Sequence, residues 1–262
     1  MCIIGIREVS SKVAFDKLEP EIRESFRCNS HGAGVAWVDK KRVHWIKGIQ
    51  NADALVKMCH KLQETVGGYI FHCRIATHGG QMAGLTHPFP VCNDYDAMRK
   101  LSGSSEKGVL FHNGIFNWAK QKPEISDTMQ FVKDYVHGCW TMWTSKSKIT
   151  ELVGSNCGSR VVILTPKDLL NYGDWQQSKD SGVWYSNGGY KSYANFVFRY
   201  NNKEEETPKI KEGDTSWYKA YKANQDKLRW TCQECWQDNP TSVSVCVHCK
   251  EKRTFGGYGY EF

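Results

Sequence analysis

Hydrophobic positions along the first 200 residues follow two periods. Short runs of β-branched and aromatic residues, bounded by Gly, Asn, Asp or Ser, predict strands. These runs cover residues 2–7, 34–38, 43–47, 69–76, 108–112, 160–164 and 183–186. The polar residues Asp39, Lys40 and Lys41 separate the second run from the third, which predicts a hairpin.

Three longer segments carry the helical period instead. In residues 16–26, Leu18, Ile22 and Phe26 recur every fourth position and would share one face. Residues 53–66 and 127–136 have the same kind of pattern. Helices interspersed with short strands predict an α+β domain.

The pattern changes after about residue 200. Residues 201–227 are dense in charge and poor in aliphatic side chains, a composition typical of a solvated segment. A compact cysteine cluster and a glycine-rich end follow. We therefore predict a main domain over residues 1–200, a charged linker over 201–228, a finger over 229–253 and a flexible tail over 254–262.

Composition limits the function classes without choosing among them. Hydrophobic residues make up 40% of the chain and charged residues 24%, as in ordinary globular proteins. No apolar run approaches the ~18 residues of a membrane-spanning helix, so no membrane partner is expected. The start, MCIIGIREVSS, lacks the features of a signal peptide, and we expect a cytoplasmic protein. The net charge of +7 permits a polyanionic partner without requiring one.

The chain contains eleven cysteines, an odd number that favours metal ligands, a nucleophile or reduced thiols over a disulfide framework. Cys2 is the most informative, because removal of Met1 would leave a thiol and an α-amino group on one residue. An α-amine with a pKa near ~7.7–8.0 is suited to deprotonate a thiol of pKa ~8.5. The alternative is a small buried residue that opens a strand.

Five short motifs follow MCIIG in a fixed order. They are NSHGAG at 29–34, RIATHG at 74–79, THP at 86–88, HNGIFN at 112–117 and SDT at 126–128. Taken together, residues 1–190 resemble the class II glutamine amidotransferases, N-terminal-nucleophile hydrolases that release ammonia from glutamine. The chain departs from the family pattern at His31, where an acidic residue is usual, and at Leu85-Thr86, where the family has Asn-Ala.

The resemblance implies the four-layer αββα fold and a catalytic group of three residues. Cys2 would attack the γ-carbonyl carbon of glutamine. The side chain of Asn113 and the backbone of Gly114 would stabilise the resulting oxyanion.

The resemblance also implies a clamp for the amino-acid end of glutamine. Arg74 would bind the α-carboxylate and Asp127 the α-ammonium group. The loop that lines the substrate would contain Thr77, His78 and Gly79.

Each position also has a purely structural interpretation. Arg74 could form a surface ion pair, Asp127 could cap a helix, and Asn113-Gly114 could form a hairpin turn. The remaining cysteines of the main domain lack metal-ligand spacing and are expected to be reduced structural residues: Cys28, Cys59, Cys73, Cys92, Cys139 and Cys157.

The last four cysteines have the spacing of two zinc knuckles. Cys232, Cys235, Cys246 and Cys249 form C-x2-C-x10-C-x2-C, a set of four thiolates that can hold a structural Zn²⁺. With Trp230 and Asn239, the pattern resembles the zinc finger of the Ran-binding nucleoporin type. That resemblance implies a module that binds single-stranded RNA or protein. The alternative is a zinc ion that only fixes the tail to the main domain.

These observations predict a glutamine amidohydrolase that acts through a thioester on Cys2. About sixty residues follow the catalytic region, too few for a synthetase domain. We therefore expect ammonia to reach a partner synthetase or acceptor-binding protein in trans. The alternatives are a γ-glutamyl amide hydrolase without ammonia transfer and a catalytically idle protein that binds nucleic acid or protein through its finger.

Overall fold

The computed structural model describes residues 1–76, 82–119, 124–143, 159–191, 229–231, 238–240, 245 and 250. The chain divides into two compact units, Met1–Val197 and Phe198–Phe262. Among the described residues, no helix combines the length and the apolar character needed to cross a membrane.

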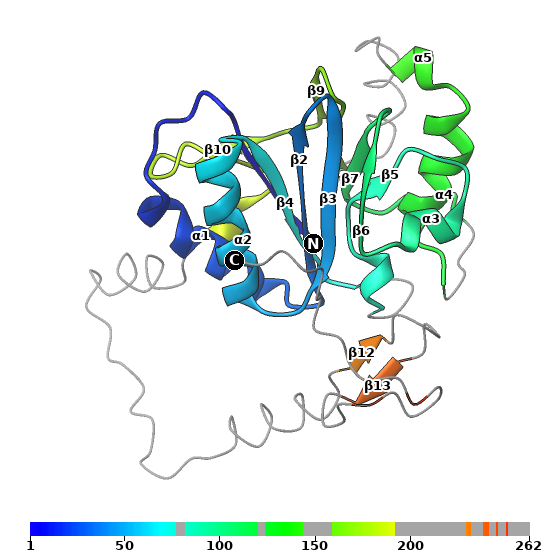
Figure 1. Ribbon diagram of the computed structural model, residues 1–262, viewed down its shortest axis with the longest axis horizontal. Helices are drawn as coiled ribbons and strands as arrows, with labels where there is room; N and C mark the ends of the chain where they lie inside the picture. Colours follow the sequence, from blue (N-terminus) through cyan, green and yellow to red (C-terminus); the bar gives the residue numbers. More distant parts are fainter. Residues whose placement is uncertain are drawn as a thin grey trace, which may run out of the picture. The chain divides into compact units, whose positions relative to one another are not determined.

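Two antiparallel sheets form the centre of the first unit (Figure 1). The larger sheet has the order β10-β11-β1-β4-β2-β3-β6, and the smaller has the order β5-β7-β8-β9. The larger sheet comprises β1 (Ile3–Arg7), β2 (Ala33–Asp39), β3 (Arg42–Ile49), β4 (Tyr69–Cys73), β6 (Ser102–Ser105), β10 (Gln176–Gln177) and β11 (Trp184–Tyr185). The smaller comprises β5 (Phe89–Pro90), β7 (Val109–Asn113), β8 (Arg160–Leu164) and β9 (Leu169–Tyr172).

The two sheets share a hydrophobic core. Ile4 and Ile70 of the larger sheet belong to the same buried cluster as Phe111 and Val162 of the smaller one. Successive side chains of a strand point to opposite faces of its sheet. The side chains that do not face the other sheet therefore face the helices.

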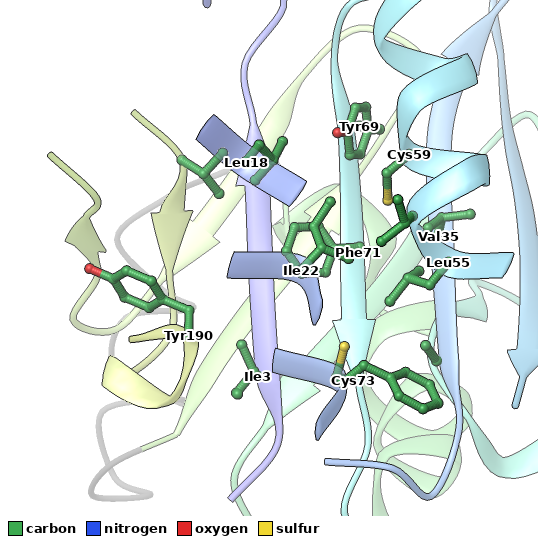
Figure 2. Close-up of a cluster of buried hydrophobic side chains, with 14 of the residues drawn as sticks. Ile3, Leu18, Ile22, Val35, Leu55, Cys59, Tyr69, Phe71, Cys73 and Tyr190 are labelled. Carbon is green, nitrogen blue, oxygen red and sulfur yellow. The ribbon is translucent and has the colours of Figure 1, made fainter. Parts of the chain in front are cut away.

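Helices cover the outer face of each sheet. Figure 2 shows Leu18 and Ile22 of α1 (Phe15–Cys28) and Leu55 of α2 (Ala52–Thr65) packed around Phe71 of β4. Against the smaller sheet pack α3 (Tyr95–Arg99), α4 (Asp127–Phe131), the π-helix η2 (Val132–His137) and α5 (Trp140–Trp143). Two short 3-10 turns, η1 (Ala83–Leu85) and η3 (Gly188–Tyr190), complete the unit.

This architecture agrees with the predicted α+β class, and each predicted strand and helix has a counterpart. One of them, a strand, ends early. The strand predicted over 69–76 stops at Cys73, and three residues later the backbone N–H of Ala76 donates to the His31 ring (2.8 Å). The helix predicted over 127–136 is α-helical to Phe131 and continues as the π-helix η2 to His137, so the predicted span is helical throughout.

The pattern missed the shortest elements. Strand β6 has the sequence SGSS, which shows no hydrophobic alternation, and it forms by pairing with β3. Strands β5 and β10 have two residues each. In such elements the pairing partner, rather than local propensity, decides the conformation.

The second unit contains an antiparallel pair of strands. β12 (Arg229–Thr231) pairs with β13 (Asp238–Pro240), with Trp230 opposite Asn239. The two strands flank the chain segment that carries Cys232 and Cys235.

Candidate active site

Cys2 directly precedes β1, which lies between β4 and β11. The half-buried thiol donates a hydrogen bond to the carbonyl of Ile75 (3.6 Å). The side-chain amide of Asn187 donates to the carbonyl of Cys2 itself (2.7 Å). Ile75 follows β4 and Asn187 follows β11, so the segments after both neighbours of β1 hold Cys2 in place.

Arg74 follows β4, the neighbour of β1. Its side chain is buried, with 5% of the residue exposed, so the interpretation as a surface ion pair is wrong. Its backbone N–H donates to Gly32 (2.8 Å), and its carbonyl accepts from the N–H of His31 (3.0 Å). The motif at 29–34 thus fixes the backbone of Arg74 by two hydrogen bonds.

The charges around Cys2 have opposing effects on its pKa. Burial raises the pKa of the thiol, whereas the hydrogen bond to Ile75 and the charge of Arg74 lower it, and Asp127 raises it. Burial also lowers the pKa of Arg74, while Cys2 and Asp127 act in the opposite direction. The charges of Arg74 and Asp127 thus act on the pKa of the thiol in opposite directions.

Asp127 is the first residue of α4, but it does not cap the helix. Ser126 is the N-cap, since its hydroxyl accepts from the N–H of Met129 (3.1 Å). One oxygen of Asp127 accepts from the N–H of Phe116 (2.8 Å) and the other from that of Thr128 (2.7 Å). The Thr128 hydroxyl also donates to the second oxygen (3.3 Å), so the first oxygen, Oδ2, keeps a lone pair for a further donor such as an ammonium group.

Asn113 ends β7, and Gly114 follows it. Strand β7 pairs with β5, which precedes it in the chain, and with β8, which begins only at Arg160. Asn113-Gly114 therefore does not form a tight turn between paired strands, and the hairpin-turn interpretation is wrong. Asn113 is fully buried, and its amide nitrogen donates to the hydroxyl of Ser186 (2.9 Å). A Cβ on Gly114 would lie 2.3 Å from the hydroxyl oxygen of Ser159, which requires glycine here.

The His112 ring contacts Thr128, which binds Asp127, and Ser159, which lies beside Gly114. The sequence motifs alone gave His112 no role. Its Nδ1 lies 3.0 Å from the hydroxyl of Thr128, which donates to Asp127 (3.3 Å). Its Nε2 lies 3.2 Å from the hydroxyl of Ser159. Burial lowers the pKa of His112 to about 4, so the ring is neutral at pH 7. Its position beside Asn113 was the available signal.

Comparisons with known protein families and with curated proteins find no match to this chain. We therefore infer the function of the chain from the arrangement of the side chains described above.

Several predicted site residues lie outside the described residues. They are Thr77, His78 and Gly79 of the substrate loop and the four zinc-knuckle cysteines, Cys232, Cys235, Cys246 and Cys249. Cys157 also lies outside them. Within the described part of the chain, no group of three or more His, Cys, Asp or Glu residues is placed to hold a metal.

The described cysteines of the first unit are all free thiols. Cys59 and Cys73 are buried, as expected of structural residues, whereas Cys28 and Cys139 are exposed. Burial raises the pKa of Cys73, which keeps this thiol protonated. A guanidinium and a carboxylate act on Cys28 as well, but its Arg27 is exposed, whereas the Arg74 that acts on Cys2 is buried.

A pocket of about 600 Å³ lies elsewhere, at the opposite end of β1. Ile6 and Arg7 line it, together with the half-buried rings of Trp175 and Trp184. It contains none of the predicted site residues, and the arrangement around Cys2 does not involve it.

Proposed function

We propose that the chain hydrolyses the side-chain amide of glutamine, with Cys2 as the nucleophile. The observation that supports this most directly is the hydrogen bond from the Cys2 thiol to the carbonyl of Ile75, the residue after the buried Arg74. The charges of Arg74 and Asp127 both act on this thiol. A cation and an anion beside a thiol suit a substrate that carries a carboxylate, an ammonium group and an amide.

The reaction needs a base, because burial raises the pKa of the thiol. After removal of Met1, the α-amine of Cys2 accepts the thiol proton. The sulfur then attacks the γ-carbonyl carbon, the C–N bond breaks, and the amine proton leaves with ammonia. Water hydrolyses the γ-glutamyl thioester to glutamate and restores the thiol.

The clamp and the oxyanion site come from three different segments. Arg74 follows β4 and would bind the α-carboxylate, while Asp127 opens α4 and would bind the α-ammonium group. Asn113 and Gly114 follow the core of β7 and would donate to the oxyanion. Thr77, His78 and Gly79 would line the substrate.

The finer fold assignment is part of the same proposal. Two sheets that share a core, with helices on both outer faces, are the arrangement that a four-layer N-terminal-nucleophile hydrolase requires. The position of Cys2 at the start of a central strand supports this assignment as well.

The fate of ammonia and the role of the second unit extend the proposal. Ammonia would pass to a partner synthetase in trans, and Cys232, Cys235, Cys246 and Cys249 would hold a structural Zn²⁺ in a module that binds RNA or protein. The pairing of β12 with β13 on either side of the first two cysteines supports a zinc knuckle.

Covalent labelling tests the nucleophile. Incubation of the purified chain with a glutamine-mimicking electrophile should give an intact mass without Met1 and with one adduct, absent in Cys2→Ala. Cys28→Ala is the matched control, because its thiol is exposed but outside the site. Retention of Met1, or an adduct that persists in Cys2→Ala, would overturn the proposal.

Ammonia release tests the clamp. Arg74→Ala and Asp127→Ala should raise the KM for glutamine by about ten-fold to a thousand-fold, since each removes a charge-assisted contact to the substrate. They should also reduce the preference for glutamine over asparagine. Unchanged rates and preference in both variants would refute the clamp. No ammonia release by the wild type would favour the binding-protein alternative.

A further inference from the structure

Ser186 joins the strand that follows Cys2 to the strand that carries Asn113. Its hydroxyl oxygen accepts from the N–H of Ile4 (2.9 Å) and from the side-chain amide of Asn113 (2.9 Å). Its own N–H donates to the carbonyl of Ile4 (3.0 Å). Because β1 and β7 belong to different sheets, this buried hydroxyl connects the two sheets at the candidate active site.

The amide of Asn113 leaves one atom unsatisfied. Among the described residues, its buried Oδ1 has no hydrogen-bond partner. The assignment of oxygen and nitrogen in an amide follows from its partners rather than from its shape. Ser186 permits both assignments, because a hydroxyl has one proton and two lone pairs, and Ile4 occupies only one lone pair.

A half-turn of the amide changes what it offers. Ser186 would then donate its proton to Oδ1 of Asn113, and Nδ2 would take the position where the unsatisfied oxygen now lies. That exchange replaces a buried acceptor by a buried donor. A donor is what a developing oxyanion requires, whereas an acceptor would repel it.

We propose that Ser186 is a positioning residue that holds the Asn113 amide with its nitrogen directed at the oxyanion, an inference that rests on the proposed glutaminase function. Asn187 acts beside it by binding the carbonyl of Cys2. The two adjacent residues thus fix the nucleophile and the oxyanion donor relative to each other.

Kinetics of glutamine-dependent ammonia release test the role. Asn113→Ala should lower kcat by about 10² to 10³, as expected for loss of one oxyanion donor, and Ser186→Ala by about ten-fold to a hundred-fold. KM should change little in either variant, because the amide acts after the substrate is bound. The double variant Ser186→Ala/Asn113→Ala should be no slower than Asn113→Ala alone.

Ser181→Ala is the matched control, since it removes a buried hydroxyl that contacts Glu21 rather than Asn113. It should lower stability and leave kcat unchanged. If Ser186→Ala lowers kcat by the same factor in the Asn113→Ala background as in the wild type, the inference is overturned. An unchanged kcat in the single variant Ser186→Ala would also overturn it.

Unfolding in denaturant separates failure of the inference from failure of the proposed function. In a double-mutant cycle, the effects of Ser186→Ala and Asn113→Ala on the free energy of unfolding should be non-additive, because the residues share a hydrogen bond. Additive effects would overturn the inference whatever the activity. Non-additive effects in a wild type that releases no ammonia would overturn the proposed function and, with it, the catalytic role of Ser186.

Discussion

At the scale of single residues, the candidate site depends on the close approach of the Gly114 backbone to two side chains. Gly114 lies beside Ser159 and the His112 ring, so a Cβ would be 2.3 Å from the Ser159 hydroxyl and 2.8 Å from Nε2 of His112. Glycine brings the backbone of the oxyanion segment against these side chains.

Gly114→Ala should therefore lower the free energy of unfolding by about 1–3 kcal/mol, the usual cost of overpacking. It should also reduce ammonia release, because Asn113 would shift. Urea unfolding measures the first effect. Gly138→Ala, where a Cβ meets nothing closer than 3.9 Å, is the control and should be neutral or stabilising. Equal stabilities of the two variants would contradict this account.

The buried His112 predicts a dependence of stability on pH. Its pKa is about 4 in the folded chain, against 6.5 without burial. Between these two pH values the unfolded chain binds more protons at this residue than the folded chain does. The contribution of the neutral His112 ring to stability is therefore complete above pH 6.5 and is lost as the pH falls toward 4. The slope is at most about 1.4 kcal/mol per pH unit for one such group.

The variant His112→Asn should flatten that dependence. Urea unfolding between pH 7 and pH 4.5 should show a smaller loss of stability in this variant than in the wild type. His60→Asn, on the exposed side of α2, is the matched control. A pH dependence that is unchanged in His112→Asn would show that another group governs it.

At the scale of elements, α1 is fixed to the end of the larger sheet by one buried carboxylate. Glu21 accepts hydrogen bonds from the hydroxyls of Ser178, Ser181 and Tyr185. Tyr185 pairs with Gly5 of β1, so this contact also supports the strand that follows Cys2.

Glu21→Ala should lower the free energy of unfolding by about 3–5 kcal/mol, because it leaves buried hydroxyl groups without their acceptor. Glu19→Ala, whose carboxylate lies on the exposed side of the same helix, should leave stability nearly unchanged. Thermal unfolding of both variants checks the difference. A loss in Glu21→Ala no larger than in Glu19→Ala would contradict a structural role for the carboxylate.

At the scale of the whole molecule, we propose that the first unit carries the chemistry and the second unit the recognition of a partner. If Cys232, Cys235, Cys246 and Cys249 hold zinc, the full chain should contain one zinc ion per molecule by elemental analysis. Cys246→Ser should lose this zinc and the binding of RNA or protein, while ammonia release persists. Loss of folding in both units, seen by circular dichroism, would favour the structural-zinc interpretation.

How far the sequence could predict the structure depends on the range of the interactions involved. Hydrophobic periodicity located the strands around Ile3 and Val161 and the helix around Ile22, because these patterns are local. It could not show that β6 forms on β3 or that the His31 ring accepts a hydrogen bond from Ala76, because residues far apart in the chain decide both.

The sequence by itself determined the α+β class and the order of the motifs, from local periodicity and residue type. Only the tertiary structure decided that Arg74 is buried, that Ser126 rather than Asp127 caps α4, and that Ser186 connects Asn113 to β1. The physical reason is that charge interactions and shared hydrogen bonds act through space, between groups that the sheets bring together from distant parts of the chain.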